Sequence, residues 1–250
     1  VASTVVTLLS KAGLDISIMG KEEVCCGGRP YDIGYRGEFI KYAEHNIEAW
    51  ANAGVKTVVT SCADCYFAFK SLYPEKGSRI EVLHTVEFLN RLIKAGKIKL
   101  NKTVPMTVTY HDPCHLGRLG EPYVAWKGVE RKIFGQMVIY DPPKPRYLGV
   151  NGVYKPPREV LNSIPGLKLI EMERNREFAW CCGAGGGVID AYPEYAAWTA
   201  WERIEEAKSS GANAIVTACP WCESNFLNTI TAHRDQMKVY DIVELVQQAI

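Results

Sequence analysis

The chain has 250 residues, of which 47% are hydrophobic and 23% are charged, a composition typical of a globular protein with a sizeable core. Its 29 basic and 28 acidic residues leave a net charge of +1, which provides no bulk attraction to nucleic acid or to an anionic membrane surface. No apolar run approaches the roughly 20 residues that a membrane-spanning helix needs, so the chain by itself is not expected to cross a bilayer.

Helical and strand patterns alternate along the first hundred residues. The chain starts inside a predicted helix (residues 2–14, ASTVVTLLSKAGL), so we expect it to be a fragment whose N-terminus is cut. Residues 38–54 have apolar side chains at helical spacing, and the apolar run at 56–62 (KTVVTSC) predicts a buried parallel strand. A second strand and helix follow at 79–96. This alternation predicts an α/β fold with short parallel sheets and with cysteines at the carboxyl ends of strands.

The chain repeats itself. The pair Cys25–Cys26 recurs 156 positions later as Cys181–Cys182, and AGVKTVVTSCADC (53–65) matches SGANAIVTACPWC (210–222) at an offset of 157. We therefore predict two pseudo-symmetric units. The first spans residues 1–100, and the second spans 101–250 with an insertion at about 119–165, which is rich in Pro, Gly and Tyr and resembles a long loop. The helix at 194–211 is expected to be amphipathic core.

Cysteine is the residue type that points to chemistry. Eight of the nine cysteines form close pairs, and such pairs in a chain with α/β patterns favour metal or redox chemistry over a disulfide framework. The nine are Cys25, Cys26, Cys62, Cys65, Cys114, Cys181, Cys182, Cys219 and Cys222. Thiolate ligands select zinc or iron–sulfur clusters. Tetrahedral zinc and a cubane cluster each take four ligands, so five cysteines in the second unit indicate an unusual cluster or a spare reactive thiol.

Two other readings of the motifs stay open. A single Cys-x-x-Cys is compatible with a thioredoxin-like redox pair, although its duplication beside two Cys-Cys pairs argues against this. The glycines after Cys182 form a weak match to a phosphate loop. No strand–GxGxxG–helix context supports that match, so we expect the glycines to admit backbone N–H groups or substrate to the sulfur atoms. They are Gly183, Gly185, Gly186 and Gly187.

Taken together, HDPCHLGR (111–118), WCCGAGGG (180–187) and the two Cys-x-x-Cys pairs resemble the cysteine-rich CCG domain family. That family includes the catalytic subunit of heterodisulfide reductase, its membrane-bound branch and its sulfate-reducer relatives. The pattern of the family is a leading Cys, then Cys-Cys-Gly, then Cys-x-x-Cys. It is complete in the second unit, whereas the first unit has no cysteine ahead of Cys25.

The resemblance implies a non-cubane [4Fe–4S] cluster on the five cysteines of the second unit, and a second cluster or zinc at the four cysteines of the first. In the family, two such clusters face each other and split a disulfide. The implied partners are a cubane ferredoxin-like domain and, for some relatives, a membrane cytochrome b or a flavoprotein; the substrate is a thiol or disulfide. We expect a cytoplasmic protein, held at the inner face of the membrane through a partner subunit.

Three residues around Cys114 are candidates for catalysis. His111 and His115 could transfer the protons that two released thiolates need, because histidine titrates near neutral pH. Arg118 could bind an anionic group of the substrate. The alternatives are hydrogen bonds to the local turn for the histidines and a surface ion pair for Arg118. The expected function is an iron–sulfur disulfide or thiol oxidoreductase; the alternative is an electron-transfer or zinc-structured subunit of a quinone-linked dehydrogenase complex.

Overall fold

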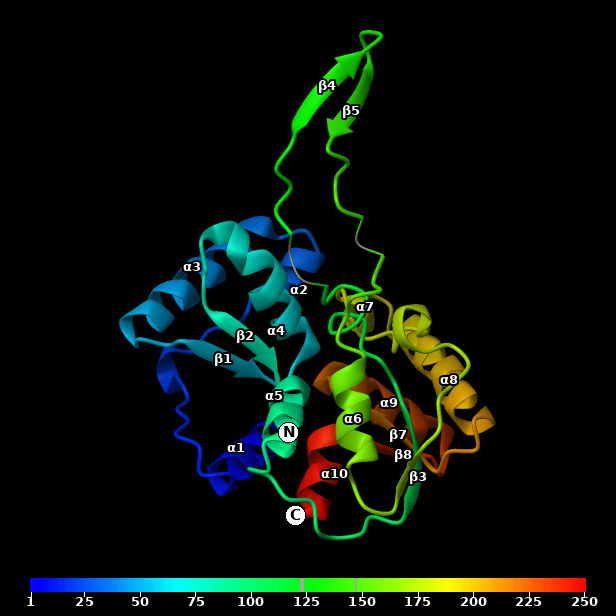
Figure 1. The fold of residues 1–250 in the computed structure, drawn as a ribbon. Helices are drawn as coiled ribbons and strands as arrows, with labels where there is room; N and C mark the ends of the chain where they lie inside the picture. Colours follow the sequence, from blue (N-terminus) through cyan, green and yellow to red (C-terminus); the bar gives the residue numbers. More distant parts are fainter. Residues whose placement is uncertain (122–123, 147) are drawn as a thin grey trace.

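The computed structural model describes residues 1–121, 124–146 and 148–250. Two separate parallel sheets organise the chain, one for each predicted unit, and an antiparallel hairpin projects from between them (Figure 1). The α/β fold class predicted from the sequence is confirmed. None of the helices in the described part of the chain is both long enough and apolar enough to span a membrane.

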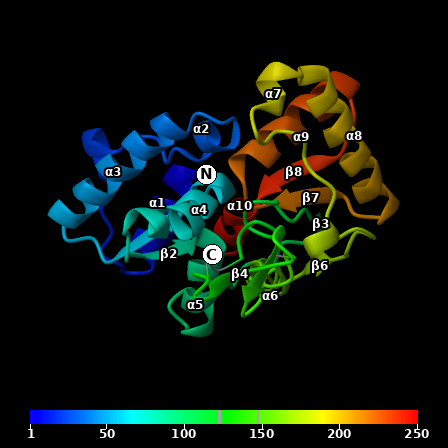
Figure 2. The same cartoon turned by 90° about the horizontal axis from the view of Figure 1, so that it is seen from above.

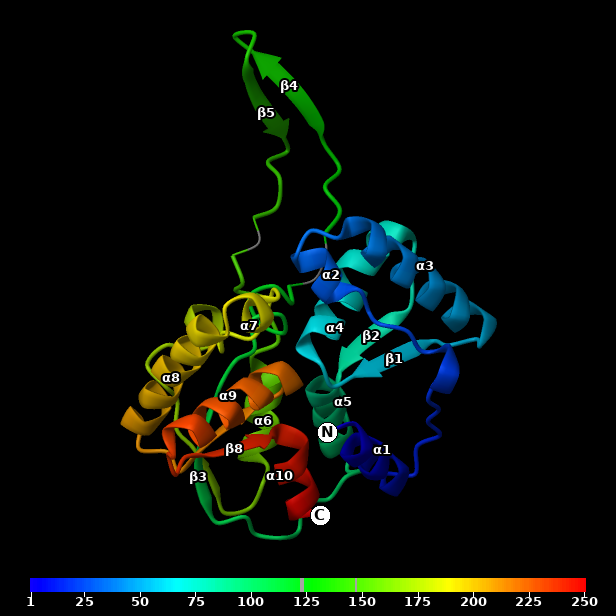
Figure 3. The same ribbon diagram turned by 180° about the vertical axis from the view of Figure 1, so that it is seen from behind.

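The first unit is built on a two-stranded sheet in which β1 and β2 pair in parallel. Its elements in chain order are α1 (Ala2–Lys11), α2 (Gly28–Asp32), α3 (Arg36–Asn52), β1 (Thr57–Thr60), α4 (Ala63–Phe67), β2 (Glu81–His84) and α5 (Thr85–Lys94). A small core beside α3 joins Phe39 and Trp50 to Tyr73. Helix α1 packs against α10 of the second unit, so the two chain ends lie close together (Figures 1 and 3).

The second unit has a four-stranded parallel sheet of order β6-β3-β7-β8. Its elements are β3 (Met106–Tyr110), α6 (Lys155–Asn162), β6 (Leu167–Leu169), α7 (Val188–Ala191), α8 (Pro193–Ser209), β7 (Ala214–Thr217), α9 (Pro220–His233), β8 (Lys238–Asp241) and α10 (Ile242–Ala249). Helices α8 and α9 pack together on one face, and α6 and α10 pack together on the other (Figure 2). The strand order reverses between β3 and β7, which is where ligand sites form in open α/β sheets.

The elements of the two units recur at matching positions. Helices α3 and α8 each have 17 residues and start at residues 36 and 193, 157 positions apart. Strand pairing has the same register, since Thr57 is opposite Glu81 and Ala214 is opposite Lys238. Helix α5, which follows β2, and helix α10, which follows β8, also both begin with a reciprocal capping box. These matches support the predicted duplication, which stays a prediction.

The expected insertion at 119–165 is not a loop throughout. Its middle is the hairpin of β4 (Val129–Ile133) and β5 (Met137–Asp141), whose side chains are almost all exposed. Its last part is helix α6, which buries Val160 and Leu161 against the core. The two prolines near the start of this helix resemble a loop signal in the sequence, but the first turn of a helix tolerates proline because its N–H groups have no intrahelical acceptor. The boundary between the units near residue 100 stays a prediction.

Candidate metal centre

Each Cys-x-x-Cys pair lies where a parallel strand ends and a helix begins. Cys62 is the N-cap of α4, two residues after β1, and Cys219 is the N-cap of α9, two residues after β7. Both cap residues have an extended backbone, which turns the chain from strand into helix. The second cysteine of each pair falls in the first turn of its helix, so three-residue spacing brings the two thiols to the same helical face.

Each Cys-Cys pair lies in a tight turn closed by glycine. The backbone N–H of Gly27 donates to Cys25 Sγ at 3.4 Å, and that of Gly183 donates to Cys181 Sγ at 3.3 Å. Both glycines have a positive φ, 76° and 83°, which side chains other than glycine adopt only with strain. A Cβ on Gly183 would also come within 2.5 Å of the Ala196 carbonyl oxygen. The glycine is therefore required for the turn that presents Cys181 and Cys182.

The nine thiols form one continuous series of hydrogen-bond contacts. All nine cysteines are free, and each contacts the next in the order Cys25, Cys26, Cys65, Cys62, Cys219, Cys222, Cys182, Cys181, Cys114. The contact between Cys62 and Cys219 joins the two units. Three cysteine-bearing segments of the second unit and two of the first therefore meet at one place, as the strand topology predicts.

Contacts within the series favour the thiolate form at particular cysteines. Hydrogen bonds from the thiols of Cys25 and Cys65 lower the pKa of Cys26 to about 3. Hydrogen bonds from Cys114 and Cys182 lower the pKa of Cys181 to about 2 in the same way. The thiolate is the form that ligates metals. The geometry thus provides deprotonated sulfur at each Cys-Cys pair.

A small cavity of about 10 Å³, which is room for about one water molecule, borders the second group of thiols. Residues of both units line it: Ala63 and Asp64 from the first, and Pro113, Cys114, His115, Cys182, Gly185, Cys219, Trp221 and Cys222 from the second. Arg29 of α2 lies 4.6 Å above the Trp221 ring and pairs with Asp190 of α7, so it holds the two units together beside this pocket. The pocket borders sulfur atoms that are mostly buried, and it would have to widen before a molecule larger than water could reach them.

His115 lies in the wall of the pocket and joins the two units. Its Nε2 lies 3.1 Å from Asp32 Oδ2, its Nδ1 lies 3.0 Å from Asp64 Oδ1, and Nδ1 is 3.5 Å from Cys114 Sγ. Burial by itself would lower the pKa of His115, but the hydrogen bonds to the two carboxylates outweigh it and raise the pKa to about 10. The sequence pattern identified His115 but not its partners, because an Asp beside a cysteine motif is a common surface residue.

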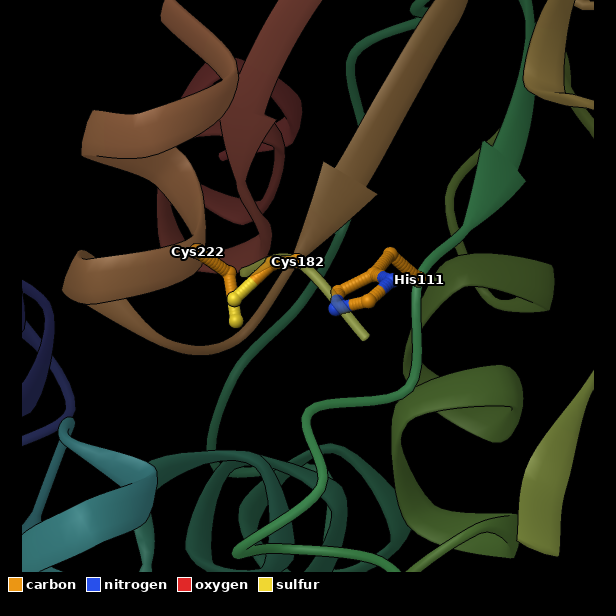
Figure 4. A group of neighbouring side chains, drawn as sticks. All are labelled: His111, Cys182 and Cys222. Atoms are coloured by element: carbon orange, nitrogen blue, oxygen red, sulfur yellow. The ribbon is translucent and has the colours of Figure 1, made fainter. Parts of the chain in front are cut away.

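His111 is placed differently. It is 1% exposed and lies outside the residues that line the pocket, with a ring nitrogen near the thiols of Cys182 and Cys222 (Figure 4). Its Nδ1 accepts a hydrogen bond from Arg203 Nε at 3.2 Å. Sequence reasoning missed Arg203, although a signal was present: its position in α8 matches the helical period of the buried Ala196, Ala200 and Ala207.

Arg118 contacts backbone rather than open space. Its Nη1 donates to the carbonyl oxygens of Glu177 and Ala179, at 3.1 and 2.8 Å, and this ties the loop after Cys114 to the segment before Cys181. Of the four predicted glycines, Gly185 lines the pocket and Gly183 contacts Cys181. Gly186 has open space where a side chain would be, and Gly187 begins α7 beside Ile33. Anion binding by Arg118 and cofactor contact by Gly186 and Gly187 stay predictions.

The donor set fits a metal centre bound by sulfur. Cys182, Cys219 and Cys222 are each 3% exposed or less, and Cys114 lies in the wall of the pocket beside them. With Cys181 they make a set of four or five sulfur ligands. The first site is more open, since Cys25 is exposed. Thiolate sets of this size bind zinc or iron–sulfur clusters, so the residues present fit either group.

Comparison with known proteins agrees with this donor set. A family model described as "Cysteine-rich domain" (CCG) matches residues 1–70 and 145–227. One subunit of the dihydromethanophenazine:CoB–CoM heterodisulfide reductase of Methanosarcina acetivorans is 36% identical over 97% of the chain and 53% of its own length. The "Probable iron-sulfur-binding oxidoreductase FadF" of Bacillus subtilis is 34% identical over the whole chain, which covers 31% of that protein's length. The EtfAB:quinone oxidoreductase of Syntrophomonas wolfei is 31% identical over the whole chain, which covers 32% of its length. The chain thus spans about half or less of the relatives it matches.

Proposed function

Because this chain belongs to the CCG cysteine-rich domain family, we propose that it is the iron–sulfur part of an oxidoreductase which reduces a disulfide, or oxidises two thiols, beside the cysteines of the second unit. The substrate would approach through the small pocket lined by Cys114, His115 and Trp221, which would have to widen to admit it. The observation that carries the proposal is the contact between Cys62 and Cys219, which brings the thiols of both units together next to that pocket.

The chemistry needs two electrons and two protons for each disulfide, which yield two thiols. The five thiolates of the second unit would hold a non-cubane [4Fe–4S] cluster, and the four of the first unit would hold a second cluster or zinc. A bound cluster would supply electrons one at a time to a substrate sulfur. The chain's own residues would admit and orient the substrate: the pocket exposes the sulfur edge, and Trp221 covers one side of it. His115 is the predicted proton-transferring residue that lines the pocket.

Partners and location follow from the same proposal. The electrons would come from other redox subunits, such as a cubane ferredoxin-like domain, a flavoprotein or a membrane cytochrome b. Relatives named as subunits or as quinone oxidoreductases support this assembly. The chain would then lie in the cytoplasm. A membrane-bound partner would hold it at the inner face of the membrane.

A second candidate is an electron-transfer or zinc-structured subunit without a substrate of its own. The relative named EtfAB:quinone oxidoreductase favours it, because that name describes electron transfer to a quinone and no disulfide. In this reading the pocket beside Trp221 would be a docking point for a redox partner and would not admit a disulfide.

The two candidates are separated by reconstitution. The chain is loaded anaerobically with iron and sulfide, and the iron and zinc per chain are measured together with the paramagnetic signal of the oxidised protein. Reduced methyl viologen is then mixed with the CoM–CoB heterodisulfide. Iron binding that Cys219→Ser lowers, together with disulfide-dependent oxidation of the viologen, supports the first proposal. Iron binding without that oxidation supports electron transfer, and a colourless protein that holds only zinc overturns the iron–sulfur assignment.

A further inference from the structure

His111 has two possible roles beside the second cysteine site. One of its ring nitrogens and the thiols of Cys182 and Cys222 all lie within 4.8 Å of one another (Figure 4). A histidine and cysteines at such distances resemble a mixed nitrogen and sulfur metal site. The same ring could instead donate an N–H hydrogen bond to sulfur. Which role applies depends on the ring nitrogen that carries the proton.

The hydrogen bond from Arg203 decides this. The Nε of an arginine only donates, so Nδ1 of His111, which lies 3.2 Å from it, presents its lone pair. In a neutral imidazole the proton then resides on Nε2. A ring whose Nδ1 accepts this hydrogen bond is not the doubly protonated cation, so it is neutral. A nitrogen that carries a proton has no lone pair for a metal.

The packing around the two residues restrains both side chains. Arg203 is fully buried, and its Nη1 donates to the Arg174 carbonyl oxygen at 2.8 Å and to Glu206 Oε2 at 2.7 Å. The ring of Phe226 packs edge-on against the His111 ring, with 4.9 Å between their centroids. The orientation of both donors is therefore determined by α8 and α9 rather than by solvent.

We infer that Arg203 is a positioning residue that holds His111 in the Nε2–H tautomer, and that His111 donates a hydrogen bond to the sulfur atoms of the second cysteine site instead of ligating its metal. The nature of that metal rests on the proposed function. Hydrogen bonds to cluster sulfurs stabilise the reduced, more negative state and so raise the reduction potential. The arrangement is specific to the second unit, since the position in α3 that matches Arg203 is Asn46, which donates to the Cys25 carbonyl oxygen.

The tautomer is tested first, in the metal-free and fully reduced 250-residue chain with ¹⁵N-labelled histidine. In the unmodified protein we expect the Nδ1 resonance of an unprotonated nitrogen and the Nε2 resonance of a protonated one. Arg203→Met should give a mixture of the two tautomers, whereas Arg203→Lys should keep part of the preference for the Nε2–H tautomer. An Nδ1–H tautomer in the unmodified chain overturns the inference, and that measurement stands even where Arg203→Met does not fold.

The second test distinguishes a ligand from a donor. After reconstitution with iron and sulfide, His111→Phe and His111→Gln are compared for iron content and midpoint potential. Both should hold as much iron as the unmodified chain, with a more negative potential for His111→Phe and a smaller shift for His111→Gln, whose side-chain amide can donate. Loss of iron in His111→Phe, or an unchanged potential, overturns the inference. If the unmodified chain takes up only zinc, the proposed function fails separately; equal zinc content in His111→Phe then still supports the donor role, and lower zinc content overturns it.

Discussion

The thiol of Cys62 is in hydrogen-bond contact with the thiol of Cys219, although the two cysteines belong to different units. Each is the N-cap residue of a helix that follows a parallel strand, so the carboxyl ends of β1 and β7 face each other. The two cysteine sites are consequently adjacent parts of one centre. A change at one site should be detectable at the other.

The first prediction tests this adjacency. Cys62→Ser should alter the paramagnetic signal of the centre in the second unit after reconstitution, because the substitution removes the sulfur atom that lies beside Cys219. Cys25→Ser is the matched control, since Cys25 is exposed and lies at the far end of the series of thiols. An unchanged signal in Cys62→Ser would show that the sites are independent.

The second prediction concerns the turn at Cys181 and Cys182. Gly183→Ala should lower the free energy of unfolding by about 2 kcal/mol or more and should reduce the iron bound, because the residue combines a φ of 83° with a Cβ position 2.5 Å from the Ala196 carbonyl oxygen. Gly186 has a φ of 58° and open space around its Cβ position, so Gly186→Ala should lower the free energy of unfolding by only about 1 kcal/mol. Urea unfolding and iron analysis measure both, and similar losses would contradict the steric argument.

The third prediction concerns the ion pairs of His115. Asp64→Asn removes one of the two carboxylates that hold the buried imidazolium, with Asp32 left as its remaining partner. The metal-free chain should lose about 1–3 kcal/mol of unfolding free energy in urea. Glu38→Gln, in an exposed pair with Lys41, should leave the unfolding free energy nearly unchanged. No loss in Asp64→Asn would show that Asp32 alone satisfies His115.

The fourth prediction concerns pH and Asp241, the buried N-cap of α10. Burial raises its pKa to about 8 in the folded chain, against 3.8 for an exposed Asp. The folded state therefore retains a proton that the unfolded chain releases, so the stabilising contribution of this residue is complete below about pH 4 and is lost as the pH rises through 8.

Asp241→Asn keeps the oxygen that accepts from the Val243 N–H but cannot ionise. Relative to the unmodified chain, it should gain on the order of 2 kcal/mol of unfolding free energy between about pH 5 and pH 8. Asp235→Asn is the control: because the hydrogen bond from Lys208 lowers the pKa of Asp235, this substitution should cause a loss that is the same at pH 5 and pH 8. Urea unfolding at both pH values measures the differences. A gain that does not depend on pH would rule out ionisation of Asp241 as the cause.

The fifth prediction concerns the projecting hairpin. Replacing residues 127–143 by a short Gly/Ser linker should change the unfolding free energy by no more than about 0.5 kcal/mol, because β4 and β5 bury almost no side chain. Leu161→Ala, in the buried helix of the same expected insertion, should cost about 2–5 kcal/mol. A large loss on removal of the hairpin would show that it contributes to the core.

Local patterns predicted the parts of this protein that depend on neighbouring residues. The run at 56–62 and its counterpart at 213–219 indicated strands that end at cysteines, because strand burial, helix capping and turn formation are determined within a few residues. The same logic identified the Cys-Cys turns and their glycines. It failed for α6, where two prolines in the first helical turn resembled a loop.

Contacts between distant residues were decided only by tertiary packing. Asp32 and Asp64 meet His115, and Arg203 meets His111 at a separation of 92 residues, because α2, α4 and α8 pack against the strand ends that carry the histidines. Hydrophobic periodicity predicts which face of a helix is buried but not which side chain it will meet. Whether a histidine lines the pocket, as His115 does, or is enclosed behind the thiols, as His111 is, therefore depends on how the two units dock.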